Sequence, residues 1–171
     1  DHTTSEWRCL RTDSDNQALT LIAEREAGVD YSVVDFDDRF WIRTNRNGAV
    51  DFALVSAPYD DTSEEGRRVE IPHRPGILLL DIEPFADFLV RTERENGLPR
   101  IVVRERATGA EHAITVREAA YDLDTSNGYL WDSPILRFNY SSPTTPAQVF
   151  DYDMRTRERT LRKTQDVPSG H

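Results

Sequence analysis

The residues that could act as nucleophiles or general bases are isolated in this sequence. A serine nucleophile on an α/β sheet needs a Gly-x-Ser-x-Gly turn, which lifts its hydroxyl above the sheet, and none of the eight glycines makes that spacing with a serine. The histidines, His2, His73, His112 and His171, form neither an i, i+4 pair nor a Glu-x-x-His pattern. For His73 and His112, a turn or strand-end position is the alternative to a triad role. We predict no catalytic residue in the chain.

Two groups of aspartates have a spacing that could suit a metal ion. Asp35, Asp37 and Asp38 form one group, and Asp151 and Asp153 form the other. A calcium loop has a central glycine and a glutamate at its twelfth position, and both groups lack these residues. We therefore predict no metal site and no cofactor, and expect solvated β-turns at both places.

Hydroxyl side chains gather near the C-terminal third of the chain, at Ser141, Ser142, Thr144 and Thr145. A nucleophile in this group would have no general base nearby in the sequence to activate it. The group is predicted to be a polar hairpin or strand end, and no substrate-binding residue is assigned to the chain.

The elements that must position these residues are short strands. The stretch from 71 to 115 is predicted to hold four of them, each ended by a turn, over residues 77–81, 87–91, 100–104 and 112–115. Asn96-Gly97 is the pair that favours a tight hairpin turn, and Thr108-Gly109 makes a second turn. The stretch therefore predicts one four-stranded antiparallel unit.

The segments on either side repeat this plan. Two strands, 6–10 and 18–23, flank the turn-forming residues 13–16, and they are followed by two further sets of four strands. These sets cover 31–34, 39–44, 52–56 and 67–71, then 120–123, 135–140, 148–152 and 160–164, with Pro146 placed just before the 148–152 strand and a last turn at 153–157.

The spacing between units indicates a repeat architecture. Ile42, Val90 and Phe138 occupy the second strands and are separated by equal steps of 48 residues. Four-stranded repeats of ~40 to 50 residues are typical of a β-propeller, and a meandering β-sandwich is the alternative. In a propeller, Trp7, Trp41 and Trp131 are expected in the core between blades, and an aromatic ligand cage would require them to converge.

Composition limits the possible partners and the compartment. The net charge of −10 disfavours nucleic acid, since phosphate binding needs a basic surface. No run approaches the ~20 apolar residues that cross a bilayer, and no secretion signal is apparent. Cys9 is the only cysteine, which excludes an intrachain disulfide. We expect a cytoplasmic location, with the periplasm as the alternative.

Several motifs resemble those of a known family. They are IRTN at 42–45, IPHR at 71–74, YSSPTTP at 140–146 and YDMRT at 152–156. With the segments around them they resemble the oligopeptidase B (protease II) branch of the prolyl oligopeptidase family of serine peptidases, over essentially the whole chain. The resemblance implies an all-β fold, a partial β-propeller of about three and a half four-stranded antiparallel blades from a seven-bladed ring.

The resemblance also implies a division into blades and a missing domain. Residues 1–27 would be the last two strands of a truncated blade, and 28–73, 74–117 and 118–168 would be complete blades. The catalytic α/β-hydrolase domain, which carries the serine, aspartate and histidine in the family, would be absent, so the fragment by itself is expected to be inactive. That domain and short peptide substrates would be the partners of the segment.

The implied function is architectural. The parent would cleave short peptides after Arg or Lys, and the propeller would limit the access of large substrates by steric exclusion and domain opening. First strands line the channel in propellers, so Tyr31–Val34, Ile77–Asp81 and Ala120–Leu123 are the expected wall. Two alternatives stay open: a free-standing module that binds a protein or a sugar, and self-association of the open fragment.

Overall fold

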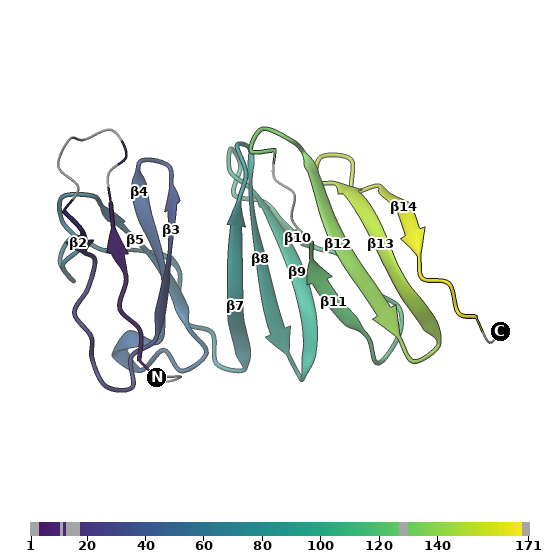
Figure 1. Cartoon of the computed structure of the whole chain (residues 1–171), viewed down its shortest axis with the longest axis horizontal. Helices are drawn as coiled ribbons and strands as arrows, with labels where there is room; N and C mark the ends of the chain where they lie inside the picture. Colours follow the sequence, from purple (N-terminus) through teal and green to yellow (C-terminus); the bar gives the residue numbers. More distant parts are fainter. Residues whose placement is uncertain (1–3, 11, 13–17, 127–129, 169–171) are drawn as a thin grey trace. The chain divides into compact units, whose positions relative to one another are not determined.

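The computed structural model describes residues 4–10, 12, 18–126 and 130–168, and all of the strands lie within these ranges. The chain divides into two compact units, Asp1–Leu78 and Leu79–His171 (Figure 1). Within the described residues, no helix has both the length and the apolar character needed to cross a bilayer. The fold is all-β, as the sequence predicts.

The first unit holds a four-stranded antiparallel meander and a short hairpin. The meander consists of β3 (Tyr31–Phe36), β4 (Arg39–Thr44), β5 (Ala53–Pro58) and β6 (Arg68–Ile71), paired in chain order. The hairpin pairs β1 (Arg8–Cys9) with β2 (Thr20–Leu21). Both of its strands are shorter than predicted, and the predicted turn at 13–16 lies outside the described residues.

Turn chemistry explains the joins within this meander. Asp37 and Asp38, with φ of 59° and 55°, form the two-residue link between β3 and β4, which matches a type I′ turn because both residues have positive φ. The link from β4 to β5 is longer and contains a 3-10 turn, η1 (Arg46–Gly48). Asn47 and Gly48 therefore turn the chain as predicted, but inside a wider connection than a tight hairpin.

The core of the first unit lies between its hairpin and one face of its sheet. Tyr31, Phe40 and Ile42 are buried there with Ile22, which follows β2. The half-buried Cys9 packs against the same cluster. Alternating residues of β3 and β4 thus supply the apolar face, because successive side chains of a strand point to opposite sides of the sheet.

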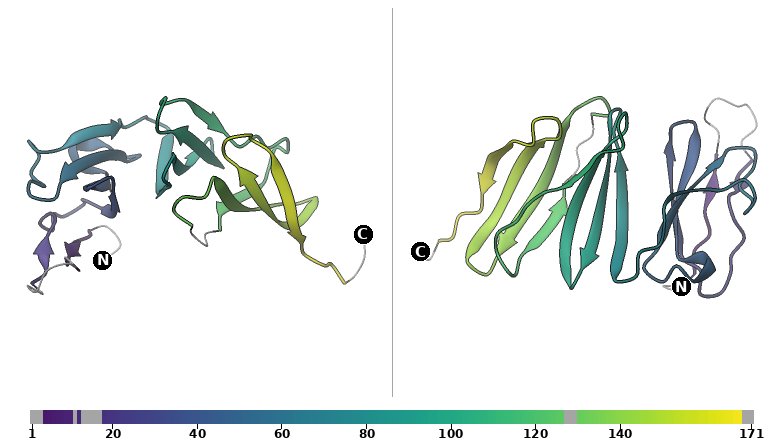
Figure 2. Two further views of the ribbon diagram at one scale, coloured as in Figure 1. Left: turned by 90° about the horizontal axis from the view of Figure 1, so that it is seen from above. Right: turned by 180° about the vertical axis from the view of Figure 1, so that it is seen from behind.

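The second unit holds two further meanders of the same kind (Figure 2). The first consists of β7 (Ile77–Pro84), β8 (Phe88–Glu95), β9 (Leu98–Glu105) and β10 (Glu111–Ala113). The second consists of β11 (Asp122–Thr125), β12 (Ile135–Ser142), β13 (Thr145–Asp153) and β14 (Arg159–Thr164). In each sheet the strands are hydrogen-bonded in chain order.

The core of the second unit lies between these two sheets. Val90 and Val103 from the first sheet are buried in one cluster with Leu136 and Phe138 from the second. The rings of Phe138 and Phe150 stack with their centroids 5.2 Å apart. Burial between the two sheets is the principal favourable term that holds them together.

The repeat predicted from spacing is present in the structure. Ile42, Val90 and Phe138 lie on β4, β8 and β12, the second strand of each sheet, and all three are buried. Equivalent positions therefore contribute to the cores of successive sheets. The prediction of successive four-stranded antiparallel units is confirmed.

Two details of the third sheet differ from the prediction. Strand β11 begins at Asp122, so Ala120 and Tyr121 lie in the connection before it. Pro146 lies inside β13 and not before it. The pairing of β12 with β13 is irregular between Tyr140 and Ser142, and such a bulge accommodates a residue that has no N–H to donate.

The three tryptophans do not share one environment. Trp41 on β4 is buried, whereas Trp7 and Trp131 keep 41% and 50% of their surface exposed. The prediction that all three belong to the core is therefore wrong for the last two. The indole Nε1 of Trp7 donates to the Tyr31 carbonyl at 2.8 Å, and the Trp131 carbonyl accepts from the Ala86 N–H at 2.9 Å.

Candidate functional site

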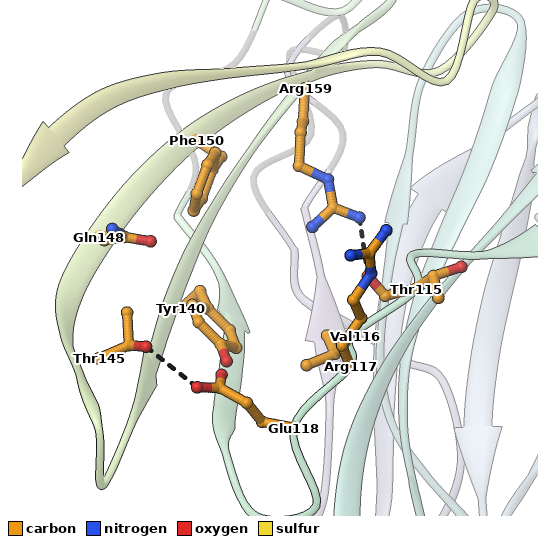
Figure 3. A pocket seen from close by; sticks show the side chains of 9 residues that line it. All are labelled: Thr115, Val116, Arg117, Glu118, Tyr140, Thr145, Gln148, Phe150 and Arg159. Atoms are coloured by element: carbon orange, nitrogen blue, oxygen red, sulfur yellow. Dashed lines mark hydrogen bonds between the residues drawn. The ribbon is translucent and has the colours of Figure 1, made fainter.

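A pocket of about 520 Å³ opens in the second unit, between the connection that follows β10 and the strands β12, β13 and β14 (Figure 3). Its volume falls in the ~300 to 1,000 Å³ range that is usual for small-molecule sites. The lining residues are Thr115, Val116, Arg117, Glu118, Tyr140, Thr145, Gln148, Phe150 and Arg159.

The connection that forms one wall is fixed at its start. Ile114 is buried, and its N–H donates to the Ile101 carbonyl at 2.9 Å. Val116 packs against the core of the unit, while Arg117 is exposed. One apolar side chain on each side of Thr115 therefore anchors this segment and leaves the following polar residues at the pocket.

Glu118 forms one end of the pocket. Its Oε1 accepts hydrogen bonds from the hydroxyls of Ser142, Thr144 and Thr145, each at 3.0 Å. Desolvation acts to raise the pKa of Glu118, but the three hydroxyl donors outweigh it and lower that pKa below its usual value. The carboxylate is therefore charged at neutral pH and held in one position.

The other side of the pocket is cationic. The Arg159 guanidinium, from β14, donates to the Thr115 carbonyl at 2.7 Å. In Figure 3 the guanidinium groups of Arg117 and Arg159 lie across the pocket from the Glu118 carboxylate, and the rings of Tyr140 and Phe150 lie on the same side as that carboxylate. The pocket thus has a cationic side and an opposite side that is anionic and aromatic.

A second charged cluster in this unit is largely buried. Arg91 on β8 donates from Nε to Glu93 at 2.5 Å, and from Nη1 and Nη2 to the two carboxylate oxygens of Glu111 at 2.8 and 2.7 Å. Hydrogen bonds from Arg91 and, to a lesser degree, Arg104 lower the pKa of Glu111 to about 2, against an opposing effect of desolvation. This cluster joins strands of one sheet and does not line the pocket.

The histidines considered for a triad role and described by the structure, His73 and His112, do not line the pocket. His73 follows β6 and places Nε2 3.5 Å from a carboxylate oxygen of Asp51. His112 lies on β10 beside Tyr152, with ring centroids 6.0 Å apart, and burial together with the charge of Arg157 lowers its pKa. His2 and His171 lie outside the described residues.

The aspartates considered for metal binding are engaged in protein contacts. Asp35 accepts from the Tyr59 hydroxyl at 2.5 Å. Asp151 accepts two hydrogen bonds from Arg137 at 2.7 and 3.0 Å. Asp153 Oδ1 accepts from two backbone N–H groups of the turn before β14, at 2.8 and 3.1 Å. Among the described residues, no group of three or more His, Cys, Asp or Glu side chains is arranged to hold a metal ion.

The hydroxyl group predicted as a polar hairpin does form the turn between β12 and β13. Sequence reasoning singled out Ser142, Thr144 and Thr145, but it missed Glu118, to which they donate, and both arginines of the pocket. Glu118 lies 24 residues before Ser142, and no local pattern links the two positions. The cluster of neighbouring hydroxyls was the one available signal, because such a cluster often surrounds a charged group.

The three successive meanders, with equal steps between their second strands, define the chain as a segment of a β-propeller. A family model described as the N-terminal beta-propeller domain of prolyl oligopeptidase matches residues 1–165. The chain therefore belongs to the prolyl oligopeptidase family and forms part of its propeller domain.

Similar proteins agree with this assignment. The chain is 35% identical over 96% of its length to dipeptidyl aminopeptidase BI of Pseudoxanthomonas mexicana, and 33% identical over 92% to protease 2 of Moraxella lacunata. It spans 22% of the length of each relative. In the closed form of oligopeptidase B from Trypanosoma brucei with bound antipain, 25% of that chain matches 99% of this one, with a TM-score of 0.88 and 27% identity.

Proposed function

We propose that this chain is the non-catalytic propeller segment of a serine oligopeptidase, and that it restricts the access of large substrates to an active site on an α/β-hydrolase domain of the same protein. The observation that carries the proposal is the family match, which covers residues 1–165. A rigid set of twisted sheets excludes folded proteins by size, while a short peptide passes through a channel or an opening between domains.

We also propose that the parent enzyme prefers to cleave after Arg or Lys. Oligopeptidase B is among the similar structures, whereas the most identical of the relatives named above is a dipeptidyl aminopeptidase. An acidic set of first strands supports a cationic substrate: the exposed residues of β3, β7 and β11 are all aspartates, namely Asp35, Asp81, Asp122 and Asp124. Opposite charge raises the local concentration of a cationic peptide and its rate of association.

The first experiment compares the chain with its full-length parent on a short fluorogenic peptide that contains one internal arginine. The parent should cleave it, a serine-directed inhibitor should stop the cleavage, and the chain alone should be inactive. Cleavage by the chain itself would overturn the assignment of a non-catalytic role.

Specificity needs a separate measurement. An N-terminally blocked peptide with arginine before the scissile bond and a substrate that releases a free dipeptide should be compared on the parent. Faster cleavage of the blocked arginine peptide supports the oligopeptidase B type. Cleavage of the dipeptide-releasing substrate alone would replace it with a dipeptidyl aminopeptidase activity.

The role of the first strands as a channel wall remains part of the proposal. Asp81→Trp and Asp124→Trp place bulky side chains at exposed positions of β7 and β11. In the parent, both variants should slow a long peptide more than a dipeptide-sized substrate. Equal slowing of the two substrates would contradict a wall at these strands.

A further inference from the structure

The pocket between the 115–118 connection and β12–β14 combines opposite charges with aromatic surface. Glu118 supplies the negative charge, and Arg117 and Arg159 supply the positive charge on the side away from it (Figure 3). Tyr140 and Phe150 provide aromatic surface on the Glu118 side, and both rings pack against the core of the unit. A complementary ligand has a cation and an anion at opposite ends and an apolar group that reaches the two rings.

We propose that this pocket binds a short peptide with free termini, holding its α-ammonium group at Glu118 and its α-carboxylate at Arg117 and Arg159. An apolar side chain of the peptide lies against Tyr140 and Phe150.

The chemistry of the ligand matches these groups at neutral pH. The terminal carboxyl of a peptide has a pKa of about 3.5 and its terminal amine a pKa of about 8, so most copies carry both charges. Guanidinium groups suit a carboxylate because their N–H donors match its two oxygens. A pocket of about 520 Å³ holds a ligand of dipeptide or tripeptide size and excludes a folded protein.

Two of the binding groups, Glu118 and Arg159, are already held in place before a ligand arrives. Three hydroxyl donors fix one oxygen of Glu118, and Arg159 is tied to the connection through the Thr115 carbonyl. Groups that are ordered in the free protein lose less conformational entropy on binding. The hydrogen bonds from the described residues engage Oε1 of Glu118, so its Oε2 is the proposed acceptor for an ammonium group.

Isothermal titration calorimetry of the 171-residue chain with glycyl-phenylalanine tests the proposal. The expected result is saturable binding with a dissociation constant below about 1 mM at low ionic strength. N-acetyl-glycyl-phenylalanine lacks the cation and glycyl-phenylalaninamide lacks the anion. Each should bind about tenfold more weakly, because each loses a charge-assisted contact. Equal binding of all three would overturn the two-ended site.

Matched variants assign the site to this pocket. Arg159→Gln should weaken dipeptide binding about tenfold, whereas Arg162→Gln, on the same strand but paired with Asp151, should leave it unchanged. Glu118→Gln should abolish the discrimination between the dipeptide and its N-acetyl form, and Glu158→Gln serves as its control.

Circular dichroism shows whether each variant keeps the fold. Arg117→Gln provides a second variant at an exposed position, where the change cannot disturb the core. Unchanged binding in folded Arg159→Gln and Arg117→Gln would overturn the proposal. Such a result would leave the proposed role in an oligopeptidase intact, since peptide hydrolysis by the parent is measured separately.

Discussion

Two arginine–carboxylate pairs, one in each sheet of the second unit, are each joined by two hydrogen bonds and have different surroundings. Arg91 binds Glu111 through Nη1 and Nη2, and Arg137 binds Asp151 through Nε and Nη2. Arg91 is only 3% exposed and its second partner Glu93 is 0% exposed, whereas the Arg137 side chain is half exposed. Arg91 lies on a strand whose first four residues are all buried, and Arg137 lies on an open face.

The second strands of the two sheets differ in burial in the same way. In β8, successive residues from Phe88 to Arg91 are all buried, so both faces are covered. In β12, residues 135 to 139 alternate between exposed and buried. A strand buried on both faces reads as a nearly continuous apolar run, while a strand with one open face alternates. Equivalent strands of a repeat can therefore differ in burial even where their backbone pairing is the same.

The largest expected difference in stability between the two pairs appears when one arginine is removed at a time. Arg91→Ala should lower the free energy of unfolding by about 3–5 kcal/mol, because it removes a guanidinium partner of the buried Glu93. Arg137→Ala removes an exposed partner and should leave the free energy of unfolding almost unchanged. Urea denaturation of both variants measures the difference. Equal losses would mean that burial does not distinguish the two pairs.

A second test uses neighbouring residues on the two faces of β12. Leu136 is fully buried and Ile135 is 39% exposed. Leu136→Ala should cost about 3 kcal/mol through the lost apolar contacts and the cavity, and Ile135→Ala well below about 1 kcal/mol. The stability of both variants should be measured in the chain and in its full-length parent. A larger cost for Ile135→Ala in the parent would indicate that further protein covers this face.

The smallest expected effect concerns pH. Glu111 has a lowered pKa of about 2 in the folded state, so its ion pair stabilises the fold fully above its unfolded pKa near 4.5. That contribution is lost as the pH falls from about 4.5 through about 2. Glu111→Gln should therefore be less stable by about 1 kcal/mol at pH 7, a value reduced for solvent screening.

The difference between Glu111→Gln and the unmodified chain should vanish as the pH approaches 2. Thermal unfolding followed by circular dichroism at several pH values measures it. Asp87→Asn, at an exposed ion pair with Arg155, is the control. A difference that stays constant from pH 7 to pH 3 would argue against the ion pair as its source.

Much of the fold is predictable from the sequence because its determinants are local. Apolar residues at regular spacing, such as Ile42 and Val90, predict the second strands, and Asn96-Gly97 predicts the hairpin between β8 and β9, where both residues have positive φ. Pro146 was misplaced because a bulge depends on the partner strand. Trp7 was misplaced because its hydrogen bond to Tyr31 depends on a contact distant in sequence.

The pocket was less predictable than the sheets. Its acidic end joins Glu118 to a hairpin 24 or more residues further on, and its cationic side draws on Arg159 from the last strand. Such residues come together only when β10 and β14 have paired in their sheets. The hydroxyl cluster at Ser142 could be found in the sequence, but Glu118, the carboxylate to which it donates, could not.

The pairing of every sheet in chain order has a consequence for how the molecule is made. Each described strand in the three meanders pairs only with strands next to it in the sequence, so the loops that close during folding are short and their entropic cost is small. A sheet can form as soon as its own four strands have left the ribosome, without waiting for later parts of the chain. Synthesis from the N-terminus therefore favours assembly one sheet at a time.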